Sequence, residues 1–240
     1  MAAPARVMGL SIRPAGSSSP LALDTIRLVS GSGAEGDRHA DALSPRQLLL
    51  VGADAYAGHD LAPHALRENL LFDAGVAGLV SGALLQVGSQ ALVRVMFVCE
   101  ACGQLDRHGE RLAARIGPER GMLARVLRGG EVHVGDAVRM LDTSLAPWPE
   151  DWRERIARVL DAAPDGSVVS YAQLARLAGI QTSYCRAFPS LLKKLGPRYA
   201  AKAVTARADP AAPRWDGAGL FDPAPSDAAL ADLKLANPAR

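Results

Sequence analysis

The alternation of apolar and polar positions divides the chain into two parts. Up to about residue 142, short runs rich in Val, Leu and Ile are separated by glycine-containing turns, which is typical of β-strands. Predicted strands cover residues 6–12, 25–29, 47–51, 83–87, 91–97 and 137–141. Gly88-Ser89-Gln90 separates two of them and predicts a hairpin. Many short strands at this spacing favour a β-barrel or sandwich over a βαβ sheet. Helical periodicity here is limited to residues 62–70 and 107–116.

The pattern changes after a proline-containing segment, Ser144-Leu145-Ala146-Pro147-Trp148-Pro149, which predicts a linker. Beyond it, apolar residues recur with helical spacing over residues 150–163 and 171–178, and from Thr182 or Ser183 to Leu195. Ser170 is a candidate N-cap and Gly179 a candidate terminator of the middle helix. We therefore predict a first domain at 1–143, a linker at 144–149, a small helical domain at 150–205, and a loosely packed tail rich in Ala, Pro and Asp at 206–240.

The composition is that of a globular chain, because 49% of its 240 residues are hydrophobic and 22% are charged. No apolar run approaches the ~18–20 residues of a membrane span, and the N-terminus lacks the order of a signal peptide. We expect a cytoplasmic protein without a membrane partner. The three cysteines, Cys99, Cys102 and Cys185, fit reduced thiols better than a disulfide framework.

Charge is distributed unevenly, although the net charge is only +2. Residues 166–202 contain no Asp or Glu and the following basic residues: Arg176, Arg186, Lys193, Lys194, Arg198 and Lys202. Such a stretch indicates a surface that faces an anionic partner. The alternative is a solvated basic face without a partner.

One glycine-rich segment imitates a dinucleotide-binding loop. Gly31-Ser32-Gly33-Ala34-Glu35-Gly36 matches the spacing of that fingerprint and follows a predicted strand. The fingerprint works only when the last glycine opens a helix whose N-terminus holds the pyrophosphate. No helical period follows Gly36, and Pro45 comes soon after, so we reject this interpretation.

Several polar motifs follow one another in the first domain. They are Gly36-Asp37-Arg38-His39 with Arg46-Gln47 behind it, Arg67-Glu68-Asn69-Leu70, Cys102, Arg120-Gly121, and the closing run Gly129-Gly130-Glu131-Val132-His133-Val134-Gly135-Asp136. In this order and spacing, residues 5–142 resemble the MOSC domain, which occurs at the C-terminus of molybdenum-cofactor sulfurases and in stand-alone bacterial proteins. The specificity lies in the order of the motifs, since none is specific alone.

This resemblance implies a mainly β fold, a MOSC β-barrel with short helices, and a pocket for the molybdenum cofactor (molybdopterin). Cys102 matches the family cysteine, which ligates molybdenum or carries a persulfide, because thiolate is a soft ligand and a nucleophile. The matching positions for binding the cofactor, including its phosphate and pterin ring, are Asp37, Arg38, His39, Arg46, Arg67 and Asn69. Two structural alternatives stay open: Asp37 and Arg38 pair across a turn, or Asn69 is a cap.

Cys99-Glu100-Ala101-Cys102 is also a C-x-x-C motif. Structural zinc requires four ligands, and the sequence holds no second pair of this kind. The remaining alternatives are a dithiol in which Cys99 resolves an oxidised or persulfidated Cys102, and a Cys99 that is a buried core thiol.

The second part resembles the winged-helix half of alkylguanine-DNA alkyltransferases and alkyltransferase-like proteins. The run from Pro164 to Tyr171, Gln173-Leu174-Ala175, Ala178-Gly179 and Arg186-Ala187 carries the resemblance. It implies a small α-helical winged-helix-like domain that binds DNA through Tyr171 and Arg186, with Lys193 and Lys194 in the same basic stretch. Two departures weaken it. The alkyl-accepting Pro-Cys-His-Arg motif is absent, and Pro189 falls inside the predicted recognition helix, which a proline breaks or kinks.

The leading hypothesis is an enzyme of molybdenum-cofactor chemistry that acts through Cys102, either as a sulfur carrier or as a reductase of N-hydroxylated compounds. Its expected partners are a small-molecule substrate and a sulfur donor or redox protein. The alternative is a nucleic-acid-binding protein with a non-catalytic MOSC module. Pyridoxal phosphate is not expected, because no desulfurase domain fits in 240 residues.

Overall fold

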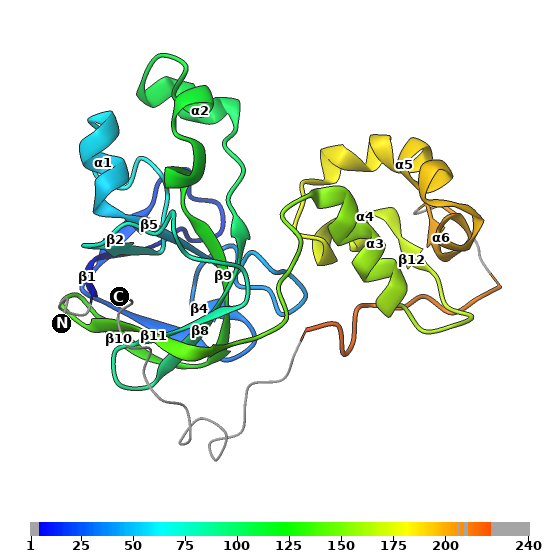
Figure 1. Cartoon of the computed structure of the whole chain (residues 1–240), viewed down its shortest axis with the longest axis horizontal. Coiled ribbons are helices and arrows are strands. Elements are labelled where there is room, and N and C mark those ends of the chain that lie inside the picture. The colour runs from blue at the N-terminus through cyan, green and yellow to red at the C-terminus, as the bar shows by residue number, and fades with distance from the viewer. Residues whose placement is uncertain (1–4, 206, 209–210, 222–240) are drawn as a thin grey trace. The chain divides into compact units, whose positions relative to one another are not determined.

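The computed structural model describes residues 5–205, 207–208 and 211–221. The chain divides into two compact units, and each is described by itself. Of the described residues, unit 1 comprises 5–42 and 46–148, and unit 2 comprises 43–45 and those from 149 onward. Unit 1 holds most of the strands and unit 2 most of the helices (Figure 1). Within the described residues, no helix is both long enough and apolar enough to cross a membrane.

The strands of unit 1 are β1 (Ala5–Ile12), β2 (Leu21–Leu23), β3 (Thr25–Val29), β4 (Gly33–Ala34), β5 (Leu48–Gly52), β6 (Leu70–Phe72), β7 (Ala83–Val87), β8 (Ala91–Val98), β9 (Met122–Arg128), β10 (Gly130–His133) and β11 (Ala137–Ser144). All six predicted strands are present, with ends shifted by a few residues at most. The predicted hairpin is confirmed, since β7 and β8 pair antiparallel with Val87 opposite Ala91.

Seven of the described strands close into a barrel in the order β11-β7-β8-β9-β5-β6-β1, and β1 pairs back with β11. Closure comes from Ala5 opposite Val138 and Arg6 opposite Ala137. The mainly β prediction is therefore correct. The barrel interior is a continuous core of small and branched apolar side chains such as Leu50, Val93 and Val126. Each such fully buried side chain contributes about 1.5–3 kcal/mol to the stability of the fold.

One row of paired residues crosses the strands β1, β6, β5, β9 and β8. Leu10 near the end of β1 lies opposite Leu70 at the start of β6. Leu50 of β5 lies beside both Leu70 and Met122, the first residue of β9. Met122 in turn lies opposite Val98, the last residue of β8. Because β6 runs parallel and β9 antiparallel to β5, the segments next to these two strands leave this row in opposite directions. The side chain of Arg67 joins them, because its Nη1 donates to Oε1 of Gln104 in the segment after β8.

Short helices surround the end of the barrel at which β5 and β8 finish. α1 (Ala53–His59) follows β5, and the excursion between β8 and β9 contains η1 (Gly103–His108), α2 (Leu112–Arg115) and η2 (Gly117–Arg120). Figure 1 shows α1 and α2 rising from the same end of the barrel. The excursion was predicted as one helix over residues 107–116. The structure breaks it at Gly109 and at Arg111, whose φ is 50°.

The helix predicted over residues 62–70 is wrong. His64 and Arg67 both have left-handed backbone torsions, with φ of 59° and 58°, which no α-helix accommodates. The Glu68 carboxylate accepts hydrogen bonds from Tyr56 and His64 and fixes this irregular loop. The actual helix, α1, lies earlier in the chain.

Unit 2 contains α3 (Trp152–Ala162), β12 (Val169–Ser170), α4 (Tyr171–Leu177), η3 (Thr182–Ala187), α5 (Phe188–Leu195), α6 (Pro197–Lys202) and β13 (Ala203–Val204). The predicted apolar face of the first helix is largely confirmed, because Ile156, Val159 and Leu160 are fully buried. Ser170 is the N-cap of α4 and accepts a hydrogen bond from the Gln173 amide at 3.3 Å, as predicted. A C-terminal helical region is thus present.

The last predicted helix is divided in two. Thr182 and Ser183 do not cap it; a 3₁₀ segment begins after Gln181, and the α-helix starts only at Phe188. Pro189 consequently occupies the first turn of α5, where a missing amide hydrogen costs nothing. The expected break inside a recognition helix does not occur.

Part of the expected tail is ordered against unit 2. The Val168 amide donates to the Pro213 carbonyl at 2.9 Å, and the Trp215 amide donates to the Val168 carbonyl at 2.8 Å. Gly217 packs so closely on Leu177 that a Cβ there would lie 2.3 Å from a Leu177 methyl. The rest of the predicted tail, residues 222–240, lies outside the described residues.

Candidate functional site

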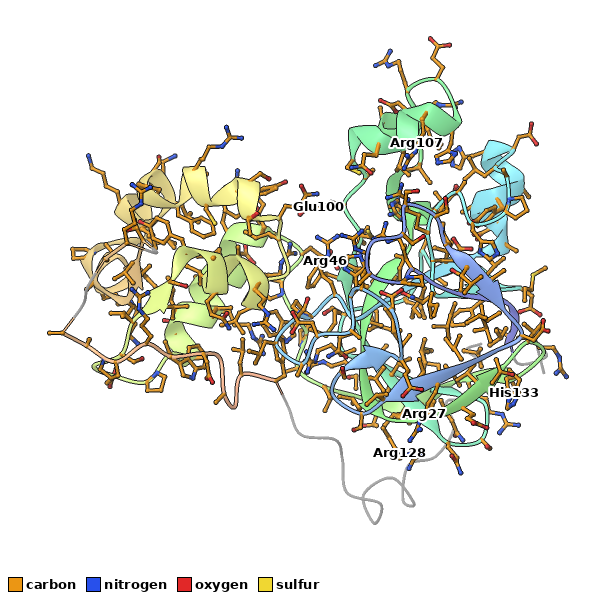
Figure 2. All side chains as sticks on the ribbon, turned by 180° about the vertical axis from the view of Figure 1, so that it is seen from behind. Arg27, Arg46, Glu100, Arg107, Arg128 and His133 are labelled. Carbon is orange, nitrogen blue, oxygen red and sulfur yellow. The ribbon has the colours of Figure 1, made fainter. Side chains whose placement is uncertain are left out.

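The loops next to these strands hold most of the predicted site residues, and contacts of Arg67 bring them together. Arg13 directly follows β1, Arg67 to Asn69 precede β6, Cys102 follows β8, and Arg120 precedes β9. The turn that contains Asp37 joins them through hydrogen bonds to Arg13 and Asn69. Figure 2 shows Arg107 on the helical excursion, at the barrel end where β8 finishes, and Arg27, Arg128 and His133 toward the other end.

Asp37 is the structural centre of these loops. It is 7% exposed, and its carboxylate accepts from the Arg13 amide at 2.7 Å, the His39 amide at 2.7 Å and the Asn69 side chain at 3.0 Å. The proposed pairing with Arg38 across the turn does not form, because no ion pair joins these two side chains. Asp37 therefore shapes the site and has little remaining capacity to accept a bond from a ligand.

Asn69 likewise uses its amide inside the protein. Its Oδ1 accepts from the Leu49 amide at 3.0 Å, and its Nδ2 donates to the Ser11 carbonyl and to Asp37. Gln47 does the same for the glycine-rich loop, donating to the Gly31 carbonyl at 2.6 Å and accepting from the Val126 amide at 2.9 Å. Both amides hold loops in place, so the expected contact of Asn69 with a pterin ring does not fit its geometry.

Five guanidinium groups surround the loops that Asp37 joins. We call Arg13, Arg38, Arg67, Arg107 and Arg120 the arginine cluster. Burial and then the charges of Arg67, Arg38 and Arg120 lower the pKa of Arg13, against the opposing effect of Asp37. Burial and then the charges of Arg107, Arg120 and Arg38 lower the pKa of Arg67, while the Cys102 thiolate acts to raise it. The members of the cluster thus repel one another, and Arg67 lies beside Cys102.

Two members of the cluster bury N–H groups without a partner. Arg120 is 9% exposed, and its Nε and Nη1 form no hydrogen bond in the described structure. The Nε of Arg13 is also buried without a partner. A buried donor left unsatisfied costs about 1–3 kcal/mol, and more when it is charged. Native proteins rarely leave such groups unpaired, so a water molecule or an anion is their expected partner.

Cys102 is partly exposed at the foot of the helical excursion, where it precedes η1. Cys99 is 4% exposed, and its amide donates to the Gly121 carbonyl at 2.8 Å. Both thiols are free, so they form no disulfide with each other. Cys99 therefore has the position of a core thiol, and Cys102 is the accessible sulfur. No group of three or more His, Cys, Asp and Glu side chains gathers as a metal site anywhere in the described part of the chain.

His39 lies next to the cluster, with its Nε2 2.5 Å from Nη2 of Arg13. Since an arginine can only donate, Nε2 acts as the acceptor and the ring is neutral. Desolvation lowers the pKa of His39 to about 4, and Arg13, Arg46 and Arg38 lower it further against the opposing effect of Asp37. His39 is therefore an uncharged hydrogen-bonding group at neutral pH. Arg46 is half-buried nearby.

The basic residues of unit 2 fall into two groups. Arg198 pairs with Asp161 at 3.2 Å, and Lys202 pairs with Asp165 and donates to the Ala163 carbonyl at 2.8 Å. Within the described residues, no ion pair involves Arg186, Lys193 or Lys194. Tyr171 and Lys193 line a groove of about 330 Å³, together with Pro189, Leu192, Gly196, Pro197 and Ala200. The Tyr171 ring packs edge-on against Phe188 at 5.4 Å.

Sequence reasoning missed three members of the cluster as site residues. Arg120 was part of a recognised motif without a role, and Arg107 lies one helical turn beyond Cys102. Arg13 belongs to no motif. Its only sequence indication was a basic residue at the end of a predicted strand that the barrel topology brings beside Asp37.

Together these features define a mainly β barrel with a partly exposed thiol and a cluster of arginines beside it. Residues 39–139 match the MOSC domain family, less than half of the chain. YiiM from Geobacillus stearothermophilus is similar in fold, with a TM-score of 0.50 and 14% identity over 79% of this chain and 100% of that one. Residues 39–139 are thus similar to the MOSC domain.

Two further solved structures are similar to the chain. YiiM from Escherichia coli has a TM-score of 0.46 and 19% identity over 82% of this chain and 94% of that one. The YuaD protein from Bacillus subtilis has a TM-score of 0.48 and 20% identity over 56% of this chain and 93% of that one. No curated protein matched the sequence.

Proposed function

We propose that the MOSC domain binds the molybdenum cofactor, with Cys102 as the protein ligand of molybdenum, and reduces N-hydroxylated compounds. The observation that carries this proposal is the pair of buried arginines with unpartnered N–H groups, Arg120 and Arg13. Molybdopterin ends in a phosphate, the group that guanidinium donors bind most specifically.

The residues at the barrel end fit the cofactor in two respects. Cys102 offers a soft thiolate, the ligand type expected for a metal that arrives already held by the sulfur atoms of a pterin. Arg120, Arg13 and the neutral His39 offer donors for phosphate oxygens. When bound, the cofactor supplies the two-electron redox chemistry of molybdenum. Reduction of N–OH to N–H consumes two electrons and two protons and releases water, so the protein also requires an electron-donating partner.

The division of roles follows from exposure. Asp37 and Asn69 hold the loops, Arg120 and Arg13 bind phosphate at depth, and Cys102 faces the open side where a substrate enters. The same accessible thiol would serve a sulfur carrier that holds a persulfide, which is the second use of this site. Cys99 is buried and packs with the strand ends, so it has no part in either use.

The test is the molybdenum and pterin content of protein purified without oxygen from a host that makes the cofactor. Wild-type protein is expected to contain both, and Cys102→Ser to lose the metal, because a hydroxyl is neither soft nor readily ionised. Cys99→Ser is the matched control and should retain it. If wild-type protein contains no metal and persulfide reagents label Cys102, the reductase hypothesis is rejected and the sulfur-carrier hypothesis takes its place.

A second candidate function is DNA binding by unit 2. Arg186, Lys193 and Lys194 lie on a stretch without carboxylates and form no ion pair among the described residues. Unpaired cations of this kind supply the phosphate contacts of sequence-independent binding. Binding of the full-length protein to a DNA duplex at low salt tests it, and the absence of binding would leave these side chains as a solvated face.

A further inference from the structure

The arginine cluster is graded in depth. Arg120 is buried and Arg13 is half-buried with a buried Nε, whereas Arg107 is exposed on the helical excursion. Arg107 belongs to η1, the turn that starts directly after Cys102, and Arg67 interacts with both of these residues. The cluster therefore has an inner part and an outer part.

Arg67 belongs to the outer part. Its Nη1 lies 3.4 Å from Oε1 of Gln104, which is also in η1, so the side chain reaches across to the turn beyond Cys102. Its backbone is left-handed, with φ of 58°, a conformation that side-chain-bearing residues rarely adopt. Strained residues of this kind cluster at functional sites. The fold thus holds a guanidinium beside the thiol in an unfavourable backbone conformation.

The charge of the cluster exceeds what one phosphate requires. A phosphate monoester carries a charge of about −1.5 to −2 at neutral pH. The described structure places five guanidiniums here, and the only carboxylate that opposes Arg13 is Asp37, whose oxygens already accept three hydrogen bonds. After the inner arginines have bound a phosphate, the outer arginines still present unneutralised donors toward solvent.

We propose that Arg67 and Arg107 form a second anion site on the solvent side of Cys102, which selects substrates that carry a carboxylate or a phosphate. This inference rests on the proposed function, in that it assigns the inner arginines to the cofactor and the outer ones to the substrate. Gln104 positions the fork of Arg67, and Arg107 closes the site from the excursion.

The experiment compares the binding of three probes to purified full-length protein by calorimetry. The probes are benzamidoxime, which is neutral, and its 4-carboxylate and 4-phosphate derivatives. Wild-type protein is expected to bind at least one anionic probe about ten-fold more tightly than the neutral one, with a preference that weakens as salt rises. Comparing the two anionic probes shows whether the site takes the carboxylate or the phosphate.

Variants separate the two parts of the cluster. Arg107→Ala should remove the preference for the anionic probes, and Arg107→Lys should restore part of it, while both retain the molybdenum content of the wild type. Arg27→Ala, at the opposite end of the barrel, is the matched control and should change nothing (Figure 2). Equal affinity of wild-type protein for all three probes, or a loss of molybdenum in Arg107→Ala, would overturn the proposal.

The two proposals fail in different ways. Wild-type protein without molybdenum or pterin, but with an anion preference that depends on Arg107, would refute the proposed function and keep the second anion site. Wild-type protein that contains the cofactor but shows no anion preference would support the proposed function and refute the second anion site.

Discussion

The arginine cluster of unit 1 and the basic stretch of unit 2 carry the same charge in opposite environments. In the cluster, Arg120 and Arg13 bury N–H groups that find no partner in the described structure. In the basic stretch, Arg198 and Lys202 pair with Asp161 and Asp165, and Lys193 and Lys194 are exposed to water. Water forms the hydrogen bonds of a solvated cation. Burying a cation without a partner raises the free energy of the folded state, and a bound anion lowers it again.

The comparison shows that a count of basic residues is a poor guide to a ligand site. The longest carboxylate-free stretch of the sequence turns out to be partly neutralised by acidic residues that precede it in the chain. The cluster is scattered from residue 13 to residue 120 and looks unremarkable in the sequence. Burial without compensation distinguishes the two, and each prediction below tests that distinction.

The largest effect is expected from removing the carboxylate that organises the cluster. Asp37→Ala leaves three donors unpaired and should reduce the free energy of unfolding by about 3 kcal/mol. Asp161→Ala is the matched change in unit 2, where an exposed pair contributes at most about 1 kcal/mol. Urea unfolding of both variants measures the difference, and equal losses would remove the contrast between the two regions.

Removing the buried, unpartnered guanidinium should have two effects of opposite sign. Arg120→Met should stabilise cofactor-free protein by about 1–3 kcal/mol, because it removes the unsatisfied donors and fills the same space. The same variant should retain at least ten-fold less cofactor. Thermal unfolding and metal analysis provide the two readouts. A destabilised Arg120→Met protein would mean that the guanidinium is already satisfied in the folded chain.

A smaller effect is expected in unit 2, on binding and not on stability. The double variant Lys193→Ala/Lys194→Ala should leave the free energy of unfolding unchanged to within about 0.5 kcal/mol. If unit 2 binds DNA, the salt dependence should lose about two units of slope. Arg198→Ala, whose side chain is already paired with Asp161, should leave the slope as it is. DNA titrations at several salt concentrations decide this.

The smallest effect is the pH dependence contributed by His39. Its pKa in the folded protein is about 4, below the ordinary value of 6.5. As the pH falls from 6.5 toward 4, the unfolded chain takes up a proton that the folded site excludes, so stability decreases in this window. The Tm of the wild type should fall between pH 7 and pH 4.5, and the Tm of His39→Gln should fall by about 2 °C less. The difference is small because solvent screens the charge of the ring. Identical pH profiles would show that folding does not lower the pKa of this ring.

Most of the barrel could be predicted from the sequence, because its strands alternate or form short apolar runs between turns. The strand β9 was missed, since Arg125 interrupts its apolar run although that side chain is buried in the structure. The loop before β6 was taken for a helix because periodicity does not reveal that Glu68 hydrogen-bonds Tyr56 and His64. Such bonds join side chains through the tertiary fold, which local pattern does not encode.

The candidate site could be predicted in part. Cys102 and Arg67, which the motifs singled out, lie close enough to interact. Asp37 and Asn69 were expected to contact a ligand, but an amide or carboxylate that serves a loop has the same sequence pattern as one that serves a cofactor. Arg13 could not be found from local sequence, because only the pairing of β1 with β6 brings it beside these loops.

The closure of the barrel through β1 and β11 has a consequence for protein synthesis. The strand that begins at Ala5 has its final neighbour only once Val138 exists, so the first strand waits for nearly the whole barrel to be translated. At ~5–20 residues per second this wait lasts on the order of 10 seconds, with backbone edges open to the wrong partners. Unit 2 is made after the barrel can close. We therefore expect nascent chains that stop before β11 to depend on chaperones, and chains that extend into unit 2 to need them far less.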